Sequence, residues 1–285
     1  MTLLGFALEF GVLTPELRLK STLTPLEYPI LRTIDVGQGD AILIEIDTDR
    51  QILIDVGPSQ SQLVTELRQW LEPGEKIELL VISHLHADHL GGLEELLQSY
   101  GIDSYLVAGN LATTLTATAA LNELTLTSAV RLIAEAGQTI DFEPVKLTVL
   151  APPDSFEGQS LDQAHEATIV LRVEFESQSA LLTGDLESDN EAELLARYQG
   201  TPELDIDYLK VSHHGSQTST NLDWLAATTP EIAAISIGRL NRYGHPHQAT
   251  LDRLREAGVR LYRTDQNGTI STSLAEPSLF TQTTK

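Results

Sequence analysis

One short stretch constrains the fold of this sequence more than any other: Ser83–His89, which reads SHLHADH. It follows the apolar run Leu79–Ile82 and precedes the pair Gly91-Gly92 and a series of leucines. The apolar run is typical of a buried strand, and the leucines are spaced as in an amphipathic helix. The polar cluster is therefore predicted to lie on a strand-to-helix loop, where α/β proteins commonly place functional residues.

The spacing within this stretch indicates a metal site. In an extended segment His84 and His86 share one face and can bind one cation, while Asp88 and His89, beyond the turn, can bind a second. A chain with eight histidines can also contain an H-x-H pair by chance. The added aspartate and third histidine, in this strand-loop-helix context, favour metal binding.

Composition excludes several classes of protein. The chain has 285 residues and 41% hydrophobic residues, which is enough for a substantial core. It has no cysteine, so disulfides, thiolate zinc sites, cysteine nucleophiles and cysteine-based partner chemistry are excluded. The net charge of −23 argues against general attraction to nucleic acid or anionic membranes, unless a local basic patch intervenes.

The chain is predicted to form one main domain. Residues 1–29 are expected to be an arm and linker, with Met1–Val12 as an edge strand or, alternatively, a remnant of a membrane segment. Residues 30–275 contain no long linker and are predicted to be one α/β domain of two sheets with helices outside. The threonine-rich residues 276–285 are expected to be a flexible tail. No clear signal peptide or transmembrane helix is recognisable, so the location is left open.

Polar residues also follow two strands predicted in the second half. Asp185 follows the strand Ala180–Thr183, and its carboxylate can bridge two metals, although such an aspartate is often a turn former. His213 and His214 follow the strand Tyr208–Val211. Because neighbours on a strand point to opposite sides, one imidazole is expected to face a metal and the other the substrate. Ser216, in the turn after them, is a candidate donor to a phosphate oxygen.

Further candidates lie on predicted loops. His165, before the strand Thr168–Phe175, is either a third nitrogen ligand for the metal of His84 and His86 or a solvent-exposed histidine. His245, held by the following proline, is a candidate general acid or oxyanion donor. Arg239 and Arg242 are candidate phosphate contacts in an otherwise acidic chain.

Three aspartates near strand ends are candidates to orient the ligating histidines: Asp35, Asp40 and Asp55. A dinuclear site needs such carboxylates to fix the imidazole tautomers. Asp55 is the favoured candidate, and an ordinary turn aspartate is the alternative for each.

Taken together, these motifs resemble the metallo-β-lactamase-fold domain of the ComEC-type competence proteins, which handle DNA internalisation. The resemblance covers about residues 30–272. The motifs that carry it are Asp35–Asp40 (DVGQGD), Ser83–His89, Leu182–Asp185 (LTGD), Lys210–Ser216 (KVSHHGS) and Gly244–Pro246 (GHP).

The resemblance implies an αβ/βα four-layer sandwich with a dinuclear centre of zinc or manganese between the sheets. It assigns His84 and His86 to one metal and Asp88 and His89 to the other, with Asp185 as the bridge. It makes His214 the last ligand and leaves His213 to face the substrate. At the position of His165 the family often has paired asparagines, so this chain has either a more complete site or an unrelated loop.

The leading functional hypothesis is a metal-dependent phosphodiesterase, a nuclease acting on single-stranded DNA. Asp88 or the bridging pair of cations would hold the attacking hydroxide, and His213 or His245 would protonate or stabilise the leaving oxygen. The resemblance also implies a membrane channel component as partner and an extracytoplasmic location. The alternatives are a hydrolase of small esters, lactams or phosphocholine-like substrates and a non-catalytic binding module.

Overall fold

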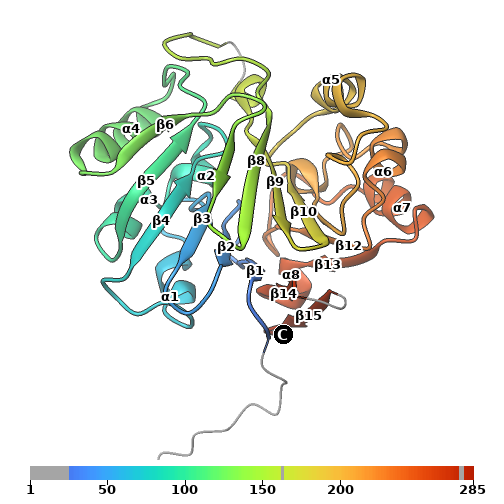
Figure 1. Cartoon of the computed structure of the whole chain (residues 1–285), viewed down its shortest axis with the longest axis horizontal. Helices are drawn as coiled ribbons and strands as arrows, with labels where there is room; N and C mark the ends of the chain where they lie inside the picture. Colours follow the sequence, from blue (N-terminus) through green and yellow to red (C-terminus); the bar gives the residue numbers. More distant parts are fainter. Residues whose placement is uncertain (1–25, 162–163, 276–278) are drawn as a thin grey trace, which may run out of the picture.

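The computed structural model describes residues 26–161, 164–275 and 279–285. The predicted arm at Met1–Val12 lies outside the described residues. The described chain forms two β-sheets that pack face to face, with helices on both outer faces (Figure 1).

Among the described residues, the first sheet has eight strands, which come from the first half of the chain and from its C-terminal end. Its strands, in spatial order, are β15 (Phe280–Thr283), β14 (Ile270–Ser273), β1 (Ile30–Thr33), β2 (Ile42–Glu45), β3 (Gln51–Ile54), β4 (Lys76–Val81), β5 (Gly101–Val107) and β6 (Val130–Ile133). The strands β3 to β6 run parallel, and the other pairs are antiparallel.

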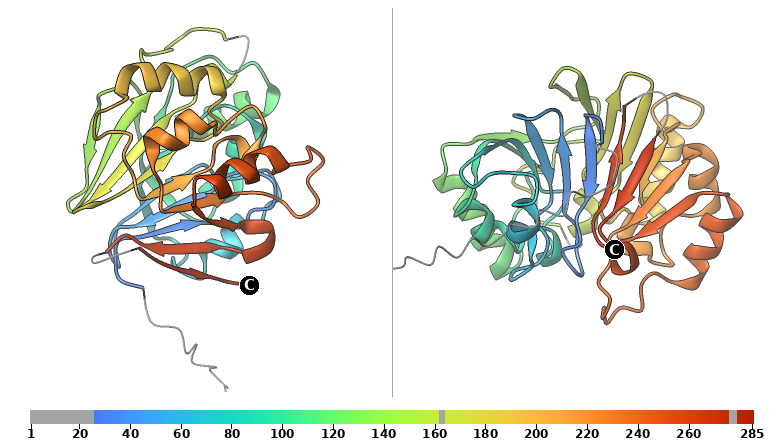
Figure 2. Two further views of the ribbon diagram at one scale, coloured as in Figure 1. Left: turned by 90° about the vertical axis from the view of Figure 1, so that its right-hand side faces the viewer. Right: turned by 90° about the horizontal axis from the view of Figure 1, so that it is seen from below.

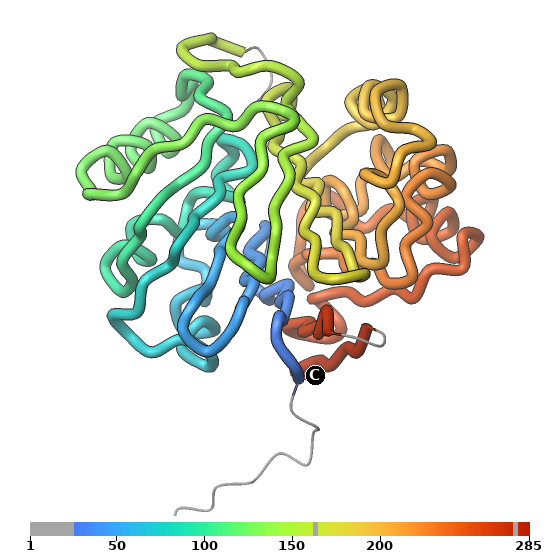
Figure 3. The backbone as a smooth tube through the Cα atoms, viewed as in Figure 1, coloured from blue at the N-terminus to red at the C-terminus, as the bar shows by residue number. Residues whose placement is uncertain are grey.

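The second sheet has seven strands in the part of the chain that the structure describes. In spatial order they are β13 (Arg260–Arg263), β12 (Ile232–Ile235), β11 (Tyr208–Lys210), β10 (Gln178–Leu182), β9 (Val170–Phe175), β8 (Val145–Ala151) and β7 (Thr139–Asp141). The strands β10 to β13 run parallel, and the hairpin pairs from β7 to β10 are antiparallel. Figure 3 shows the first half of the described chain on one side of the molecule and most of the second half on the other.

The helices fall into two groups. On the first sheet lie α1 (Leu63–Leu67), α2 (Ala87–Leu90), α3 (Leu93–Leu97) and α4 (Leu115–Leu126). On the second sheet lie α5 (Ser188–Tyr198), α6 (Leu222–Thr228) and α7 (Gln248–Glu256). The remaining short turns of helix are α8 (Thr264–Asn267) and the 3₁₀ helices η1 (Ala164–Ala167) and η2 (Ser212–Gly215).

Three apolar clusters separate these layers. The central cluster lies between the sheets and includes Leu31 from the first sheet and Leu147 and Val149 from the second. Another cluster joins the first sheet to its helices, and the third joins the second sheet to α5, α6 and α7. Figure 2 shows these helices on the outer faces of the two sheets. This arrangement confirms the predicted αβ/βα four-layer sandwich, since each sheet buries one face on the other sheet and one on helices.

The C-terminal tail differs from its prediction. Phe280–Thr283 is not frayed but forms the edge strand β15, which pairs antiparallel with β14. The Thr272 and Thr281 hydroxyls lie 3.0 Å apart across this pair, and the terminal Lys285 ammonium lies 2.6 Å from an Asp35 oxygen. β-branched threonines suit a strand, and only the tertiary structure supplies its partner.

The parallel strands place the candidate residues at one edge. Asp55 follows β3 and His84 follows β4, while Asp185 follows β10 and His214 follows β11. Because parallel strands end on the same side of a sheet, these side chains meet where the two sheets adjoin. Within the described ranges, no helix is both long enough and apolar enough to cross a membrane.

Candidate metal centre

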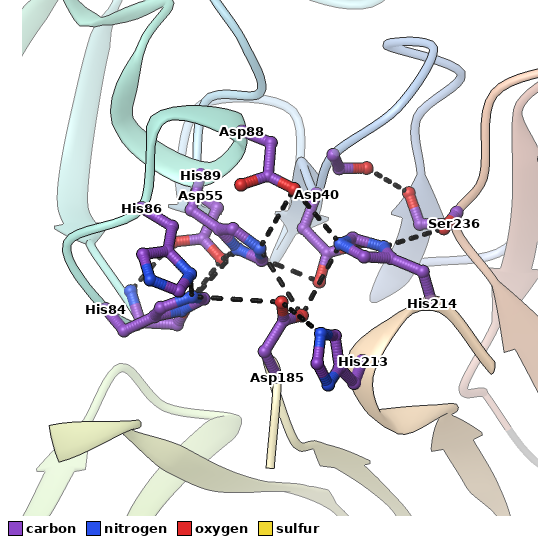
Figure 4. Close-up of polar contacts among 12 residues, drawn as sticks. Asp40, Asp55, His84, His86, Asp88, His89, Asp185, His213, His214 and Ser236 are labelled. Carbon is purple, nitrogen blue, oxygen red and sulfur yellow. Dashed lines mark hydrogen bonds and ion pairs between the residues drawn. The ribbon is translucent and has the colours of Figure 1, made fainter. Parts of the chain in front are cut away.

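The seven predicted metal ligands converge into two overlapping groups. Figure 4 labels all of them except His165. The first group consists of His84, His86, His165 and Asp185, and the second of Asp88, His89, Asp185 and His214. In each group the ligand atoms lie within 4.8 Å of one another. Asp185 belongs to both groups, as expected of a bridging carboxylate.

The first group brings three imidazoles together. His84 Nε2 lies 3.0 Å from His86 Nδ1 and 3.8 Å from Asp185 Oδ2. The His165 ring centre lies 4.5 Å from that of His86 and 5.2 Å from that of His84. Of the two alternatives for His165, the structure therefore favours a place in the cluster over a solvent-exposed loop position.

The second group is centred on one oxygen of Asp185. Its Oδ1 atom lies 3.4 Å from His89 Nε2 and 3.5 Å from His214 Nε2. Asp88 Oδ2 lies 3.4 Å from His214 Nε2 and 4.0 Å from His89 Nε2. These four side chains come from three separate segments of the chain, so the fold and not local spacing brings them together.

A glycine allows Asp185 to reach this position. Gly184 has φ +49°, and a Cβ atom there would lie 3.0 Å from a methyl group of Thr168 and 3.2 Å from the Ser83 side chain. The end of β10 can thus approach the loop after β4, because glycine adopts positive φ without steric cost and fills no space.

His213 and His214 do not continue a strand, contrary to the sequence prediction. They lie in η2 with φ values of 48° and 51°. This left-handed turn directs His214 into the second group, while His213 Nε2 lies 3.8 Å from Asp185 Oδ2 and its Nδ1 lies 3.2 Å from Glu187 Oε1. The two imidazoles therefore face different parts of the site, but because of the turn and not of strand alternation.

Asp55 orients His89. The His89 Nδ1 atom lies 2.7 Å from Asp55 Oδ2, and Asp55 also accepts hydrogen bonds from the backbone N–H and the hydroxyl of Ser83. With Nδ1 donating to this buried carboxylate, His89 Nε2 is directed to the cluster. The structure thus places Asp55 where the sequence prediction expects a supporting carboxylate.

Of the two remaining candidate carboxylates, Asp40 lies beside the ligand His214, whereas Asp35 lies away from the ligand cluster. Asp40 Oδ1 lies 3.5 Å from His214 Nδ1, which donates to the Ser236 carbonyl at 2.9 Å. Asp35 instead accepts from the backbone of Gly37 and pairs with the terminal lysine, away from the cluster. The inclusion of Asp35 among the supporting carboxylates was wrong, because the turn after β1 sends only the later aspartate inward.

Sequence reasoning missed Lys210. Its side chain is fully buried, and its ammonium lies 2.8 Å from Asp40 Oδ2 and 2.9 Å from the Val211 carbonyl. A lysine within an apolar parallel strand is a signal that could have identified it, since a buried charge requires a partner. Glu187, beside His213, was also missed and has no comparable signal.

Charge in the buried cluster is arranged to attract a cation. Burial lowers the pKa of His89, but the carboxylates of Asp185 and Asp55 outweigh this effect and raise it well above its ordinary value. Burial raises the pKa of Asp88, yet the imidazoles of His214 and His89 lower it to about 2. The carboxylates thus favour a positive charge at this point, which a proton or a divalent cation can supply.

The donor set fits a divalent cation. His89 Nε2, His214 Nε2 and Asp185 Oδ1 are buried and have no hydrogen-bond partner among the described residues. Such orphaned polar atoms are costly in a protein interior unless a bound group satisfies them. Imidazole and carboxylate are the ligands that zinc and related transition metals take.

A cavity of about 390 Å³ opens over the cluster. It is lined by Gln38, His86, Ala87, Asp88, His165, Asp185, His213, His214, Tyr243 and His245. His245, one of the predicted catalytic residues, lies 5.7 Å from His213 and 5.9 Å from Tyr243 between ring centres.

The three predicted phosphate contacts, Ser216, Arg239 and Arg242, do not line the cavity over the cluster. The Ser216 hydroxyl is buried against Thr218, and its N–H donates to the His213 carbonyl, so Ser216 offers no free donor to the cavity and this prediction was wrong. Arg239 and Arg242 are exposed and do not line the cavity. The Arg242 guanidinium lies 5.6 Å from the centre of the Tyr243 ring, at the rim.

Comparison with known proteins agrees with this fold. The family profile described as the metallo-beta-lactamase superfamily matches residues 34–239. "ComE operon protein 3" of Bacillus subtilis is 30% identical over 266 residues, which cover 85% of this chain and 33% of that protein. "Competence protein ComA" of Neisseria gonorrhoeae is 30% identical over 253 residues, covering 87% of this chain and 33% of that protein. The chain thus spans about a third of the length of these relatives.

A solved structure shares the architecture. The metallo-beta-lactamase fold protein YhfI from Bacillus subtilis aligns with a TM-score of 0.54 and 14% identity, covering 85% of this chain and 99% of that chain. At this identity the likeness concerns the fold alone. The sandwich, the convergent histidines and aspartates, and the family profile agree with one another, and the chain belongs to the metallo-β-lactamase superfamily of metal-dependent hydrolases.

Proposed function

We propose that this protein is a metal-dependent phosphodiesterase that cleaves single-stranded DNA. The observation that carries the proposal is the pair of ligand groups that share Asp185. Two such groups suit a dinuclear centre, and dinuclear centres are common in enzymes that hydrolyse phosphodiesters.

In this proposal the first group, with His165, would hold one zinc or manganese ion, and the second would hold another. Bound divalent cations at this position supply water activation and neutralisation of phosphate charge. The Asp55 carboxylate keeps His89 oriented through Nδ1, and the Ser236 carbonyl does the same for His214, with Asp40 Oδ1 3.5 Å from that nitrogen.

Side chains of this protein would accept a hydrogen bond from the attacking water and protonate the leaving oxygen. Asp88, which is ionised at neutral pH because its pKa is about 2, is placed to accept a hydrogen bond from the attacking water. His213 and His245 line the cavity and are the candidates to protonate the leaving oxygen. The Glu187 carboxylate lies 3.2 Å from His213 Nδ1, and His213 Nε2 lies 3.8 Å from Asp185 Oδ2.

The rim of the cavity supports a nucleic-acid substrate. Arg242 stacks over Tyr243, and the Tyr243 ring is stacked with His245 at an interplanar angle of 29°. Half-exposed aromatic rings beside arginines form platforms for unpaired bases. Arg239 lies in the same turn and, like Arg242, is exposed. Together these residues form a local exception to the net charge of −23.

The names of the relatives point in the same direction. Besides the two competence-related proteins, "Recombination protein 2" of Haemophilus influenzae is 30% identical over 254 residues, covering 88% of this chain and 29% of that protein. A membrane channel component as partner and an extracytoplasmic location remain part of the proposal. Both follow from the resemblance to competence proteins.

A cleavage assay tests the proposed function. Labelled single-stranded and double-stranded oligonucleotides are incubated with the protein in Mn²⁺, in Zn²⁺ and with a chelator. Wild type and the surface control Asp223→Asn are expected to cleave the single strand only with metal, and Asp185→Asn is expected to lose cleavage. Equal cleavage by Asp185→Asn and wild type would contradict the assignment of the centre.

A hydrolase of small esters, lactams or phosphocholine-like substrates is the second candidate. The net charge of −23 favours it, because a small neutral substrate is not repelled. Turnover of a neutral ester, without affinity for any oligonucleotide, would support this candidate over the nuclease. Metal binding with no turnover of either substrate class would indicate a binding module.

A further inference from the structure

A second and larger cavity adjoins the candidate metal centre. It has a volume of about 580 Å³ and lies between the segment Leu150–Phe156, which comprises the end of β8 and the loop after it, and helix α5. Both elements stand at the same end of the molecule, at the top of Figure 1. His165 lines this cavity and also the one over the metal centre, so the two spaces meet at that side chain.

Apolar and polar groups contribute about equally to the walls of this cavity, and the apolar ones form a continuous part of it around helix α5 and the end of β8. They include Leu150, Pro152, Phe156, Leu186, Leu194 and Ala196. Phe156 is only half-buried, so part of its ring remains available for contact. An apolar pocket of several hundred Å³ with an aromatic wall is the usual form of a small-molecule site.

Several polar groups interrupt these walls. Thr168 is 2% exposed, and its hydroxyl is buried without a hydrogen-bond partner among the described residues. The side chains of Asn190 and Arg197 line the same space. An unpaired buried hydroxyl is costly, so Thr168 marks a polar point in the wall of this cavity.

The charges around the cavity indicate what it can hold. Glu166 and Glu193 line it beside Arg197, so its formal charge is not positive. A second phosphate is therefore disfavoured. A neutral planar heterocycle is favoured, because its faces match the apolar walls and its edge donors and acceptors match threonine, asparagine, glutamate and arginine.

We propose that this cavity binds the nucleobase of a nucleotide adjacent to the scissile phosphate. The inference rests on the proposed phosphodiesterase function and adds the substrate contact that the metal centre lacks. With the phosphate over the ligand groups, the neighbouring base passes His165 and lies against Phe156 and Thr168. Such a base must be unpaired, so the cavity selects single strands or strand ends.

A site for a neutral base also allows a protein with a net charge of −23 to bind a nucleic acid whose phosphates it repels. A base bound by packing and hydrogen bonds releases few counterions, whereas phosphate contacts release many. Affinity for a dinucleotide is therefore expected to depend weakly on salt. Stacking and burial of one base contribute a substantial part of the free energy with which a short oligonucleotide binds.

The experiment uses two matched tryptophan variants of the full chain. Ala196→Trp fills the cavity from α5, and Ala192→Trp places the same side chain on an exposed position of that helix outside the cavity. The probe is a dinucleotide that carries the fluorescent base 2-aminopurine on one side of its phosphate. Its fluorescence reports binding in the presence of a chelator, independently of catalysis.

Wild type and Ala192→Trp are expected to bind the probe with equal affinity. Ala196→Trp is expected to bind it about tenfold or more weakly, because the loss of one stacked base costs about that much affinity. With metal present, an abasic dinucleotide is expected to raise KM for wild type and Ala192→Trp but not for Ala196→Trp. Equal probe binding by the two variants overturns the cavity assignment and leaves the proposed function intact. If wild type shows no metal-dependent cleavage of DNA, the proposed function is overturned, and this result comes from the cleavage assay and not from probe fluorescence.

Discussion

The Oδ1 atom of Asp185 lies almost equally far from Nε2 of His89 and Nε2 of His214, at 3.4 Å and 3.5 Å. All three atoms are buried and lack hydrogen-bond partners among the described residues. The other oxygen of Asp185 lies 3.8 Å from His84 Nε2 in the neighbouring ligand group. One carboxylate thus links the two ligand groups of the candidate centre.

Asp55→Asn is expected to weaken metal binding about 10- to 100-fold, because the amide no longer fixes the Nδ1 side of His89 as a carboxylate does. Asparagine tolerates the φ of +59° at this position, so the backbone is expected to remain in place. Competition with a chromophoric chelator measures the affinity. The matched control Asp35→Asn is expected to match wild type, and an equal loss in both variants would contradict the role of Asp55.

Lys210→Met is expected to destabilise the fold by about 3–5 kcal/mol, because it leaves the Asp40 carboxylate buried without its ion-pair partner. Urea unfolding measures the change. The double variant Lys210→Met with Asp40→Asn is expected to recover part of the loss. Lys76→Met, which breaks the exposed pair with Asp103, is the control and is expected to change little.

Tyr243→Ala is expected to weaken binding of single-stranded oligonucleotides by about 1–3 kcal/mol, since it removes the stacking surface at the rim. Tyr243→Phe retains the ring and is expected to bind like wild type. Fluorescence anisotropy with single-stranded and duplex probes measures both. Similar losses in the alanine and phenylalanine variants would indicate a role for the hydroxyl in place of stacking.

Glu191 is expected to make stability depend on pH. Burial raises the pKa of this carboxyl to about 7 in the folded protein, even though it accepts hydrogen bonds from the Thr220 and Asn221 backbone. The unfolded chain loses this proton near its ordinary pKa, so the folded state binds the proton more tightly. The contribution of Glu191 to stability is therefore greatest at low pH and falls between about pH 4.5 and pH 7, by roughly 3 kcal/mol.

Glu191→Gln removes this titration. The free energy of unfolding is measured by urea at pH 5 and pH 8 for wild type and variant in matched buffers. Between pH 5 and pH 8 the free energy of unfolding of wild type is expected to fall relative to that of Glu191→Gln. A constant difference in stability between the two proteins does not affect this comparison. A difference that is the same at both pH values would show that Glu191 does not carry the effect.

Local pattern was sufficient to predict the strand ends that carry His84, His86 and Asp185. Apolar runs identify buried strands directly, and the residue after such a run lies at the sheet edge whatever the rest of the chain does. The layered fold followed from the same runs together with the family resemblance.

Tertiary contacts decided the features that were predicted wrongly. The left-handed turn at His213 and His214 is packed tightly, since a Cβ at Gly215 would lie 2.7 Å from the Pro246 side chain. Asp35 and Asp40 flank the same glycine turn, and their partners show which one faces inward: Asp40 contacts Lys210 and His214, whereas Asp35 pairs with the terminal Lys285. Periodicity within a segment contains no information about such distant partners.

Metal content per chain is the sharpest test of the dinuclear centre. Wild type and the surface control Asp223→Asn, loaded with Mn²⁺ or Zn²⁺ and freed of excess metal, are expected to hold two ions per chain by elemental analysis. Asp185→Asn is expected to hold one or none, because both ligand groups lose the carboxylate that they share. Equal metal content in Asp185→Asn and wild type would contradict a dinuclear centre organised by Asp185.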